Sequence, residues 1–500
     1  MLVVWASAFI VYQTTFISTP RLFVSPETGW FANAIDIPEY ALALRGRPNE
    51  TDMRKHLLYS PLGQVLYRAA DRARLLCGMN YDTAALIFPQ ALYGATSVLA
   101  AYVLFLRLIN RWRLAAIAAC CYAFTYSMWL MSGVPESYAL TTLAVNLFLL
   151  FILREKVARG WLWYPATIGL IALCSLCDLR YVSLMVIPLY LAACAPGLKL
   201  AQRIGLMCAI VVGTCCLIGS AYTLYQYASG REGFGIGAMC KWLPSYRQES
   251  TLGHHLLDCR SIAWSLRVFF IESISPLYKK FFDQSPIALQ RIHLSLACCF
   301  WTMSATLILG SVRHIRAVNF SRRSLQALLC WLTVYLIELH AVFHRTALPH
   351  TLPIVLPLML LIVPGVIKAW GPRQFGITIM VMAAVTMLAN NLMLINEARL
   401  AWQRPAIVQS PADHIYLLPG EIERAQFLTY KMSSLCPASE RDRLTGLRTR
   451  APHTLSAQER REFDELTFKG LERLTPSERE QLRDIMHRSQ EAIRLARGGM

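Results

Sequence analysis

Apolar residues along this chain fall in continuous blocks of about 20, separated by short loops that carry most of the charges. Because a helix rises about 1.5 Å per residue, such a block matches the ~30 Å hydrocarbon core of a bilayer. A helix also satisfies its backbone hydrogen bonds within itself, as a lipid-facing segment must. The pattern predicts an all-α polytopic membrane protein with about eleven transmembrane helices. These are expected at Leu2–Ile17, Ala84–Leu106, Leu114–Ser132, Tyr138–Leu153, Trp161–Cys177, Tyr181–Ala193, Ile204–Tyr227, Ile292–Ser311, Leu325–Phe343, Thr351–Trp370 and Phe375–Asn396.

Composition supports a membrane protein. Hydrophobic residues make up 55% of the chain and charged residues 16%, an apolar excess too large for an ordinary globular domain to bury. The formal net charge of +18 would suit a nucleic-acid partner, but many Lys and Arg residues lie in brief loops between apolar blocks. Membrane topology accounts for those charges, so we expect no nucleic-acid binding.

The basic loops set the orientation of the helices. With the N-terminus in the cytoplasm, the inward loops are all basic, as the positive-inside rule requires. These loops are residues 110–113, 154–156, 199–203, 313–323 and 368–373. The sequence therefore predicts a multi-pass protein of the plasma membrane with a cytoplasmic N-terminus.

Two long segments then lie outside the cytoplasm, residues 18–83 and 228–291. The second contains an amphipathic stretch, Ile262–Phe282, whose aromatic side chains suit the membrane interface. External loops carrying interfacial helices are thus part of the predicted fold.

The chain is expected to divide into a transmembrane domain, residues 1–396, and a soluble helical tail, residues 397–500. Ser456–Glu459 and Thr475–Glu478 in the tail have the pattern of capping boxes, which begin helices. The tail is a candidate surface for a protein partner. Its balanced charges leave open the side of the membrane on which it lies.

Carboxylates follow the first predicted membrane exit. Glu27 and Asp36 lie in the first external segment, a short distance after Leu2–Ile17. A carboxylate partly shielded from water at the membrane boundary can have a raised pKa and act as general base toward a hydroxyl. Capping of a helix N-terminus is the competing interpretation for Glu27.

Two further polar residues precede predicted helices on the same side. His56 stands before an apolar segment interrupted by Pro61, and Glu136 lies at the external mouth of the span that begins at Tyr138. A structural hydrogen bond competes with a functional role for His56. An acid at the depth of Glu136 is costly and usually functional, while N-cap chemistry with Ser137 is the alternative.

Asp178 and Arg180 fill a very short external turn between two predicted spans. Mutual pairing is the simplest interpretation. Arg180 would equally suit the phosphate of a lipid, because a guanidinium offers a planar fork of donors.

Histidines and an arginine surround the external turn after the ninth predicted span, at His340, His344, Arg345 and His350. Zinc ligation is conceivable, but His340 and His344 lack the adjacent Glu of the HExxH motif. A phosphate contact by Arg345, with His344 and His350 beside it, is therefore favoured.

Three stretches together resemble the GT-C membrane glycosyltransferases, most closely the bacterial branch related to protein O-mannosyltransferases and the lipid A aminoarabinose transferase. They are the acidic segment after the first span, the sequence His-Leu-Leu-Tyr-Ser-Pro-Leu at 56–62, and the segment 124–140 with its Pro-Glu-Ser-Tyr at 135–138. The resemblance covers about residues 1–396.

This resemblance implies an enzyme of the bacterial inner membrane that takes a sugar from a polyprenyl-phosphate donor and transfers it to an acceptor hydroxyl on the extracytoplasmic side. It matches Glu27 to the family's first-loop acid, with Asp36 in reserve, and Glu136 to the acid after the third span. In metal-using relatives, acids at these two places share a divalent ion, which makes Glu27 and Glu136 the metal candidates. Arg180 and Arg345 are candidate cations for the departing phosphate.

Two other functions stay open. A transporter or flippase would require inverted repeats and polar, broken helices at the bilayer midplane, where Glu338 is the main charge. A catalytically inactive scaffold is the third reading. It stays open because residues 27–30 read Glu-Thr-Gly-Trp, where the family usually has Asp-Glu, or Asp-Ser-Gly followed by an acid. Polar residues crowd the external boundary, which favours chemistry there over transport.

Overall fold

The computed structural model of this chain describes residues 1–16, 57–72, 81–133, 137–153, 163–228, 259–277, 286–315, 322–342, 348–371, 374–403, 406–409, 414–417, 428, 431–432, 435–437, 439–441, 443–444 and 456–485. The described residues up to Ile395 form one compact unit, and those from Asn396 onward belong to a second.

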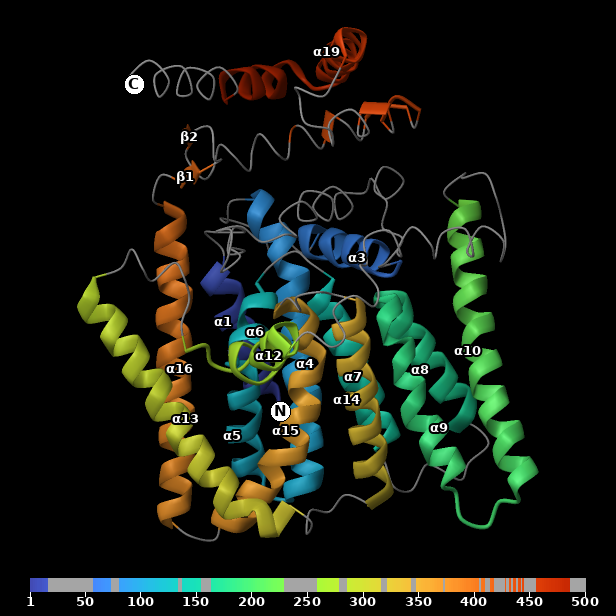
Figure 1. Ribbon diagram of the computed structural model, residues 1–500, viewed down its shortest axis with the longest axis vertical. Coiled ribbons are helices and arrows are strands. Elements are labelled where there is room, and N and C mark those ends of the chain that lie inside the picture. The colour runs from blue at the N-terminus through green and yellow to red at the C-terminus, as the bar shows by residue number, and fades with distance from the viewer. Residues whose placement is uncertain are drawn as a thin grey trace. The chain divides into compact units, whose positions relative to one another are not determined.

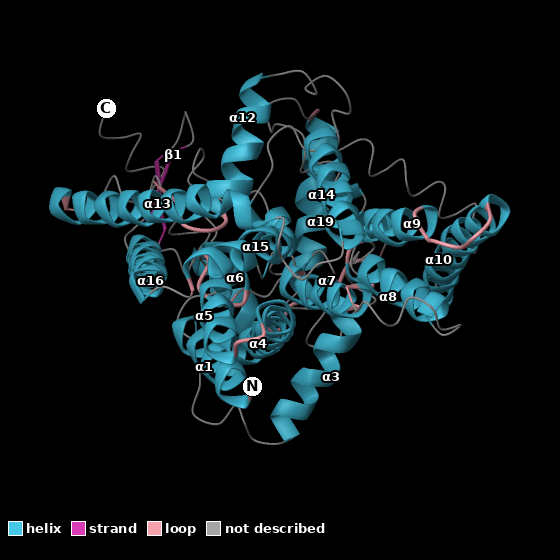
Figure 2. Cartoon of the chain, turned by 90° about the horizontal axis from the view of Figure 1, so that it is seen from below, coloured by secondary structure: helices cyan, strands magenta, loops and turns pink. Residues whose placement is uncertain are grey.

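The first unit is a bundle of helices that run alternately up and down (Figure 1). Its main helices are α1 (Leu2–Phe16), α4 (Tyr81–Ile109), α5 (Trp112–Ala123), α6 (Tyr126–Met131), α7 (Tyr138–Ile152), α8 (Trp163–Cys177), η2 (Leu179–Met185), α9 (Val186–Ala193), α10 (Leu200–Ala228), α13 (Ile287–Ile315), α14 (Arg322–Val342), α15 (Leu348–Trp370) and α16 (Gln374–Gln403). Seen from below, α4 lies close to α1, α5 and α7, with which it packs, while α10 and α13 lie at the margins (Figure 2).

Each of the expected spans coincides with one or two of these helices. Five described helices are long and apolar enough to cross a membrane by themselves, at Phe88–Ile109, Leu200–Tyr225, Ile287–Ser311, Thr351–Trp370 and Gln374–Glu397. The polytopic helical membrane fold is therefore confirmed. The count of eleven spans stays a prediction, because several of the remaining apolar helices are shorter than a bilayer requires.

The expected span Leu114–Ser132 is not one helix. α5 ends at Ala123 and α6 begins at Tyr126, because Thr125 between them has an extended backbone with φ −59° and ψ 143°. The expected span Tyr181–Ala193 likewise begins as the 3₁₀ helix η2 before continuing as α9. The first is a break in the helix and the second is a change from α-helical to 3₁₀ hydrogen bonding, and apolar content alone reveals neither.

Partners from distant segments satisfy the backbone at the break after α5. The side-chain amide of Asn391 on α16 donates to the Phe124 carbonyl oxygen at 2.7 Å and to the Ile274 carbonyl oxygen at 2.9 Å. The Tyr126 N–H donates to that same Ile274 oxygen at 2.9 Å. A broken helix is tolerated inside a membrane bundle only where such partners exist.

Asn390 extends the same polar cluster. His293 Nδ1 lies 2.6 Å from Asn390 Oδ1, and Asn390 donates to Ser275 Oγ at 2.8 Å. Ser275 in turn donates to Asn391 Oδ1 at 3.2 Å. These contacts fasten the turn around residues 273–276 to α13 and α16.

The close approach of α4 to α6 requires a glycine. A Cβ atom at Gly94 would lie 2.2 Å from Ser132 Oγ, which is a steric overlap. Nearby, the hydroxyl of Tyr12 on α1 donates to the Ala123 carbonyl oxygen at 2.7 Å, so α1 also satisfies the end of α5.

Two further helices lie in the long segments that the sequence places outside. α3 (Tyr59–Arg72) runs across the upper end of the bundle in Figure 1. α12 (Cys259–Arg267) continues as a π turn, η3 (Val268–Glu272), within the expected amphipathic stretch. Residues 278–282 of that stretch lie outside the described residues.

The second unit contains strands that the sequence analysis did not predict. β1 (Ala406–Gln409) pairs antiparallel with β2 (His414–Leu417), with Ile407 opposite Tyr416. This hairpin is an addition to the helical tail expected from the sequence. Alternation of apolar and polar residues over four positions is too short a signal to predict strands.

The helical part of this unit follows the expected capping chemistry. Ser456 caps α19 (Ala457–Glu472) in a capping box with Glu459. Thr475 and Glu478 exchange hydrogen bonds in the same way, each at 3.3 Å. Around these helices, a small apolar core gathers Leu428, Met432, Leu444, Leu474 and Leu482.

Replacing Asn391 with Leu should destabilise the first unit. The change leaves the Phe124 and Ile274 carbonyl oxygens short of a donor, and an unsatisfied buried polar group costs about 1–3 kcal/mol. We expect a lower melting temperature for purified Asn391→Leu in lipid nanodiscs. Thr378→Val, at an exposed position of the same helix, is the matched control and should melt like wild type. An unchanged melting temperature in Asn391→Leu would contradict the role assigned to this amide.

The tail unit should lose stability in acid. Burial would raise the pKa of Glu478, but hydrogen bonds from Lys431 and Thr475 outweigh burial and lower it below 4.5. A carboxyl whose pKa is lowered on folding stabilises above its unfolded pKa, and that contribution disappears as pH falls through the folded pKa. Hydrogen-exchange protection of residues 475–485, corrected for intrinsic rates, should therefore fall below about pH 4.5.

Glu478→Gln should weaken that pH dependence, because the amide does not titrate. Glu465→Gln is the control, since Glu465 forms only an exposed pair with Lys469. A steep acid transition that persists unchanged in Glu478→Gln would assign the effect to other carboxyls.

Candidate functional site

A buried ion pair lies where α8 gives way to η2. Asp178 caps η2, with its carboxylate accepting from the Arg180 backbone N–H at 3.1 Å. The Arg180 Nε donates to both carboxylate oxygens of Asp178, at 2.9 and 3.0 Å, and the Arg180 Nη2 contacts Asp178 Oδ2 as well. Asp178 is 0% and Arg180 8% exposed. The expected pairing is therefore present, and both of its charges are buried.

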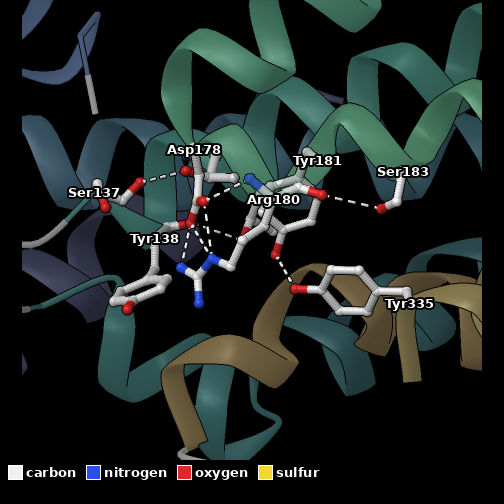
Figure 3. Close-up of polar contacts among 9 residues, drawn as sticks. Ser137, Tyr138, Asp178, Arg180, Tyr181, Ser183 and Tyr335 are labelled. Atoms are coloured by element: carbon white, nitrogen blue, oxygen red, sulfur yellow. Dashed lines mark hydrogen bonds and ion pairs between the residues drawn. The ribbon is translucent and has the colours of Figure 1, made fainter. Parts of the chain in front are cut away.

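An aromatic ring covers the guanidinium. The Arg180 Cζ lies 5.7 Å from the ring centroid of Tyr138, the first residue of α7 (Figure 3). A cation placed over a ring face is attracted by the ring quadrupole. Together, the Asp178 fork and the Tyr138 ring fix the orientation of Arg180.

A pair of tyrosines joins η2 to α14. The hydroxyls of Tyr181 and Tyr335 lie 2.6 Å apart, and their rings stack with centroids 5.3 Å apart (Figure 3). Ser183 donates to the Arg180 carbonyl oxygen at 3.1 Å and accepts from the Trp331 indole at 3.4 Å. α14 therefore forms one wall of the polar cluster around Arg180.

Glu338 brings a second carboxylate to this cluster. It lies three residues after Tyr335, on the same face of α14, and interacts with Ser183, Arg180 and Asp178. Its Oε2 atom is buried and has no hydrogen-bond partner among the described residues. Two acids and one arginine thus share a largely buried site, which we call the Arg180 cluster.

The cluster's charge limits what it can bind. Arg180 with Asp178 is a neutral unit, so it attracts a phosphate less strongly than an isolated guanidinium would. The fork geometry of Arg180 is nevertheless held ready, because Asp178 restrains the side chain. An arriving phosphate would share the guanidinium with Asp178.

Most of the other predicted site residues lie outside the described residues. These are Glu27, Asp36, His56, Glu136, His344 and Arg345. His350 stands in the first turn of α15, where its side chain is not described. The described helix ends that flank these residues lie at the same end of the first unit as Asp178, because consecutive helices alternate in direction (Figure 1).

Both metal candidates, Glu27 and Glu136, belong to that undescribed set. Within the described ranges, no group of three His, Cys, Asp or Glu side chains is arranged to hold a metal ion. A metal role for these two acids therefore stays a prediction.

Tyr181, Ser183 and Tyr335 are not among the site residues expected from the sequence. Glu338 is expected there only as a charge inside an apolar span. The spacing of Tyr335 and Glu338, three residues apart on one helix, was the available signal for a polar face on α14.

An apolar cleft lies apart from this cluster, between α5, α13, α15 and α16. It has a volume of about 180 Å³, and its walls include Cys121, Trp301, Leu358 and Met387. Nearly all of its lining is apolar, so it suits a hydrocarbon chain and not a charged group.

Solved structures with a similar arrangement of the chain share little sequence with it. The crystal structure of ArnT from Cupriavidus metallidurans bound to undecaprenyl phosphate shares 13% identity and a TM-score of 0.48, covering 99% of this chain and 78% of that one. The apo state of that protein gives 12% and 0.46, covering 98% and 77%. The Archaeoglobus fulgidus oligosaccharyltransferase, tethered to an acceptor peptide with the NVT sequon, gives 14% and 0.38, covering 95% and 59%. No protein-family model and no curated protein matches the sequence. The function proposed below therefore rests on the residues of this chain.

Breaking the Arg180 pair should destabilise the first unit strongly. Asp178→Asn and Arg180→Gln each leave one buried charge without its counter-charge, which costs about 3–5 kcal/mol. The double variant should be less destabilised than the sum of the two single variants, as measured by melting temperature. Arg443→Gln is the control, because Arg443 forms an exposed pair with Glu462 and should shift little. Strictly additive losses would show that the two charges are not coupled.

Proposed function

We propose that this protein is a membrane glycosyltransferase that moves a sugar from a polyprenyl-phosphate-linked donor to an acceptor hydroxyl. The reaction would take place on the extracytoplasmic side of a bacterial inner membrane, with the N-terminus in the cytoplasm. About eleven transmembrane helices, residues 1–396, would form the catalytic domain. Residues 397–500 would be a tail available to a protein partner.

One observation carries this proposal. A buried arginine, oriented by Asp178 and Tyr138, lies at the end of the bundle where α1 and α8 end. Transfer from a lipid phosphate requires a base for the acceptor and a cation for the leaving group, and a guanidinium fixed in one orientation can serve as that cation.

In this scheme Glu27 accepts the proton of the acceptor hydroxyl, and Asp36 is the alternative base. The acceptor oxygen bonds to the anomeric carbon from the face opposite the phosphate, with inversion. The bond between that carbon and the phosphate oxygen breaks, and its electron pair leaves with the lipid phosphate. Arg180 and Arg345 stabilise the charge that develops on the phosphate.

The remaining candidate residues would bind substrate. His56, Glu136, His344 and His350 would contact the sugar or phosphate. If a divalent ion takes part, Glu27 and Glu136 would hold it, and it would supply positive charge next to the phosphate. The apolar cleft between α5 and α13 offers room for part of a lipid chain.

A transporter or flippase is the second candidate function, because Glu338 and the breaks at Thr125 and η2 are polar features within the bundle. An inactive scaffold is the third, since the first-loop acid stands in an altered motif at Glu27. Measured sugar transfer by the purified protein would favour the glycosyltransferase over both alternatives.

The base assignment predicts a large loss of turnover on one substitution. Purified protein would be incubated with radiolabelled polyprenyl-phosphate sugars and acceptor lipid or peptide, and transfer measured. Glu27→Gln should lower turnover by about 10²-fold or more, and Asp36→Asn by less. Glu39→Gln, in the same external segment, is the matched control and should stay active. Equal turnover in Glu27→Gln, Asp36→Asn and wild type would remove the proposed base.

Arg180→Lys tests the cation separately. Lysine keeps the positive charge but loses the planar fork that contacts carboxylate and phosphate together. We expect turnover about tenfold lower, in line with the loss of one charge-assisted hydrogen bond. Wild-type turnover in a correctly folded Arg180→Lys protein would place the leaving-group cation elsewhere.

A further inference from the structure

Five buried polar side chains lie on α4 and on α7 with its N-cap, two helices that pack against each other. We define the α4–α7 seam as Gln90, Tyr93 and Ser97 on α4, with Ser137 and Asn146 from α7 and its N-cap. All five are between 0% and 3% exposed. The three residues on α4 follow a spacing of three and then four, so they share one helix face over about 10 Å.

Each of these side chains has one polar atom without a hydrogen-bond partner among the described residues. The atoms are Gln90 Oε1, Tyr93 Oη, Ser97 Oγ, Ser137 Oγ and Asn146 Oδ1. Buried polar atoms in native proteins are nearly always satisfied, by protein or by ordered water. Five of them along one seam would consume a large part of a domain's net stability if the seam were dry.

Other contacts hold the two amides of the seam in place. Gln90 Nε2 donates to the Tyr59 hydroxyl at 2.6 Å. Asn146 Nδ2 donates to the Tyr122 hydroxyl at 3.0 Å and to the Ser97 carbonyl oxygen at 3.3 Å. These contacts engage the amide nitrogens, and they leave Gln90 Oε1 and Asn146 Oδ1 without a partner among the described residues.

We propose that the α4–α7 seam holds a file of internal water molecules. The seam offers two amide oxygens, which only accept, and three hydroxyls, which donate and accept. Water matches this mixture because it does both. The five side chains carry no charge, so the seam has no counter-charge for an anion and no carboxylate for a cation.

The file would begin at the Arg180 cluster. Ser137 precedes Tyr138, whose ring covers Arg180 (Figure 3). Tyr93 interacts with Cys177, the residue before Asp178. Water in the seam would therefore reach the buried ion pair from inside the bundle and lower the desolvation penalty of its charges. This inference does not depend on the proposed glycosyl transfer.

Removing a single oxygen distinguishes a wet seam from a dry one. Tyr93→Phe deletes only the hydroxyl. If water occupies the seam, the substitution loses a hydrogen bond, and the melting temperature in nanodiscs should fall by about 1–2 °C. If the seam is dry, the substitution removes an unsatisfied polar group, and the melting temperature should be unchanged or higher. Tyr12→Phe is the positive control, because that hydroxyl donates directly to the Ala123 carbonyl oxygen and its loss should lower the melting temperature.

Radiolytic hydroxyl-radical labelling of the wild-type protein gives the second readout, because ordered water beside a buried side chain is itself converted to radical. Tyr12 is 0% exposed and Tyr93 is 3% exposed, so bulk solvent reaches neither ring. Tyr93 should nevertheless be modified several-fold faster than Tyr12. A higher or unchanged melting temperature in Tyr93→Phe, or equal labelling of the two tyrosines, would overturn the proposal. Neither readout involves sugar transfer, so an inactive protein would leave this inference intact and remove only the proposed function.

Discussion

Hydrocarbon offers no hydrogen bonds, so every polar group within the bundle needs a partner from the protein or from water. The break between α5 and α6 exists because this requirement is met from a distance. Asn391, which lies 267 residues after Phe124, supplies the donor that the interrupted helix lacks. The turn at residues 273–276 and the N-terminal half of α6 are fastened by the same contacts, so one amide holds three segments of the bundle together.

The same requirement explains which features the sequence could predict. A span of apolar residues is a local signal, and it located the main helices because backbone bonds within a helix need no outside partner. The pairing of Asp178 with Arg180 was predictable for the same reason, since two residues of separation bring opposite charges together in a tight turn. Capping of α19 by Ser456 and Glu459 is equally local. In each case the partners are neighbours in the sequence.

Interactions between distant segments were not predictable in this way. Tyr335 meets Tyr181 across 154 residues, and no property of either residue alone indicates that contact. The helix breaks at Thr125 although the surrounding sequence is apolar, because Asn391 on α16 and Ile274 in the turn after η3 satisfy the backbone of Phe124 and Tyr126. The hairpin of β1 and β2 depends on pairing between two strands of four residues, each too short for a periodic pattern to identify. Glu27, Asp36 and Glu136 were selected by the sequence alone and stay predictions.

The Arg180 pair is better explained by chemistry than by stability. A buried ion pair contributes little net stability compared with apolar residues of the same volume, because the desolvation penalty of both charges offsets their attraction. Leu or Met side chains at both positions would avoid that penalty, although they would also remove the Asp178 cap of η2. What they would not provide is a guanidinium held in one orientation by Asp178, covered by Tyr138 and approached by Glu338. A second carboxylate beside an already neutral pair makes the cluster still less favourable electrostatically, and Glu338 retains an unpaired oxygen within the described part of the bundle. Such a cluster is costly unless a cation, a proton donor or a hydroxyl of a bound molecule completes it, and that need makes it the most informative place in this protein to look for a substrate.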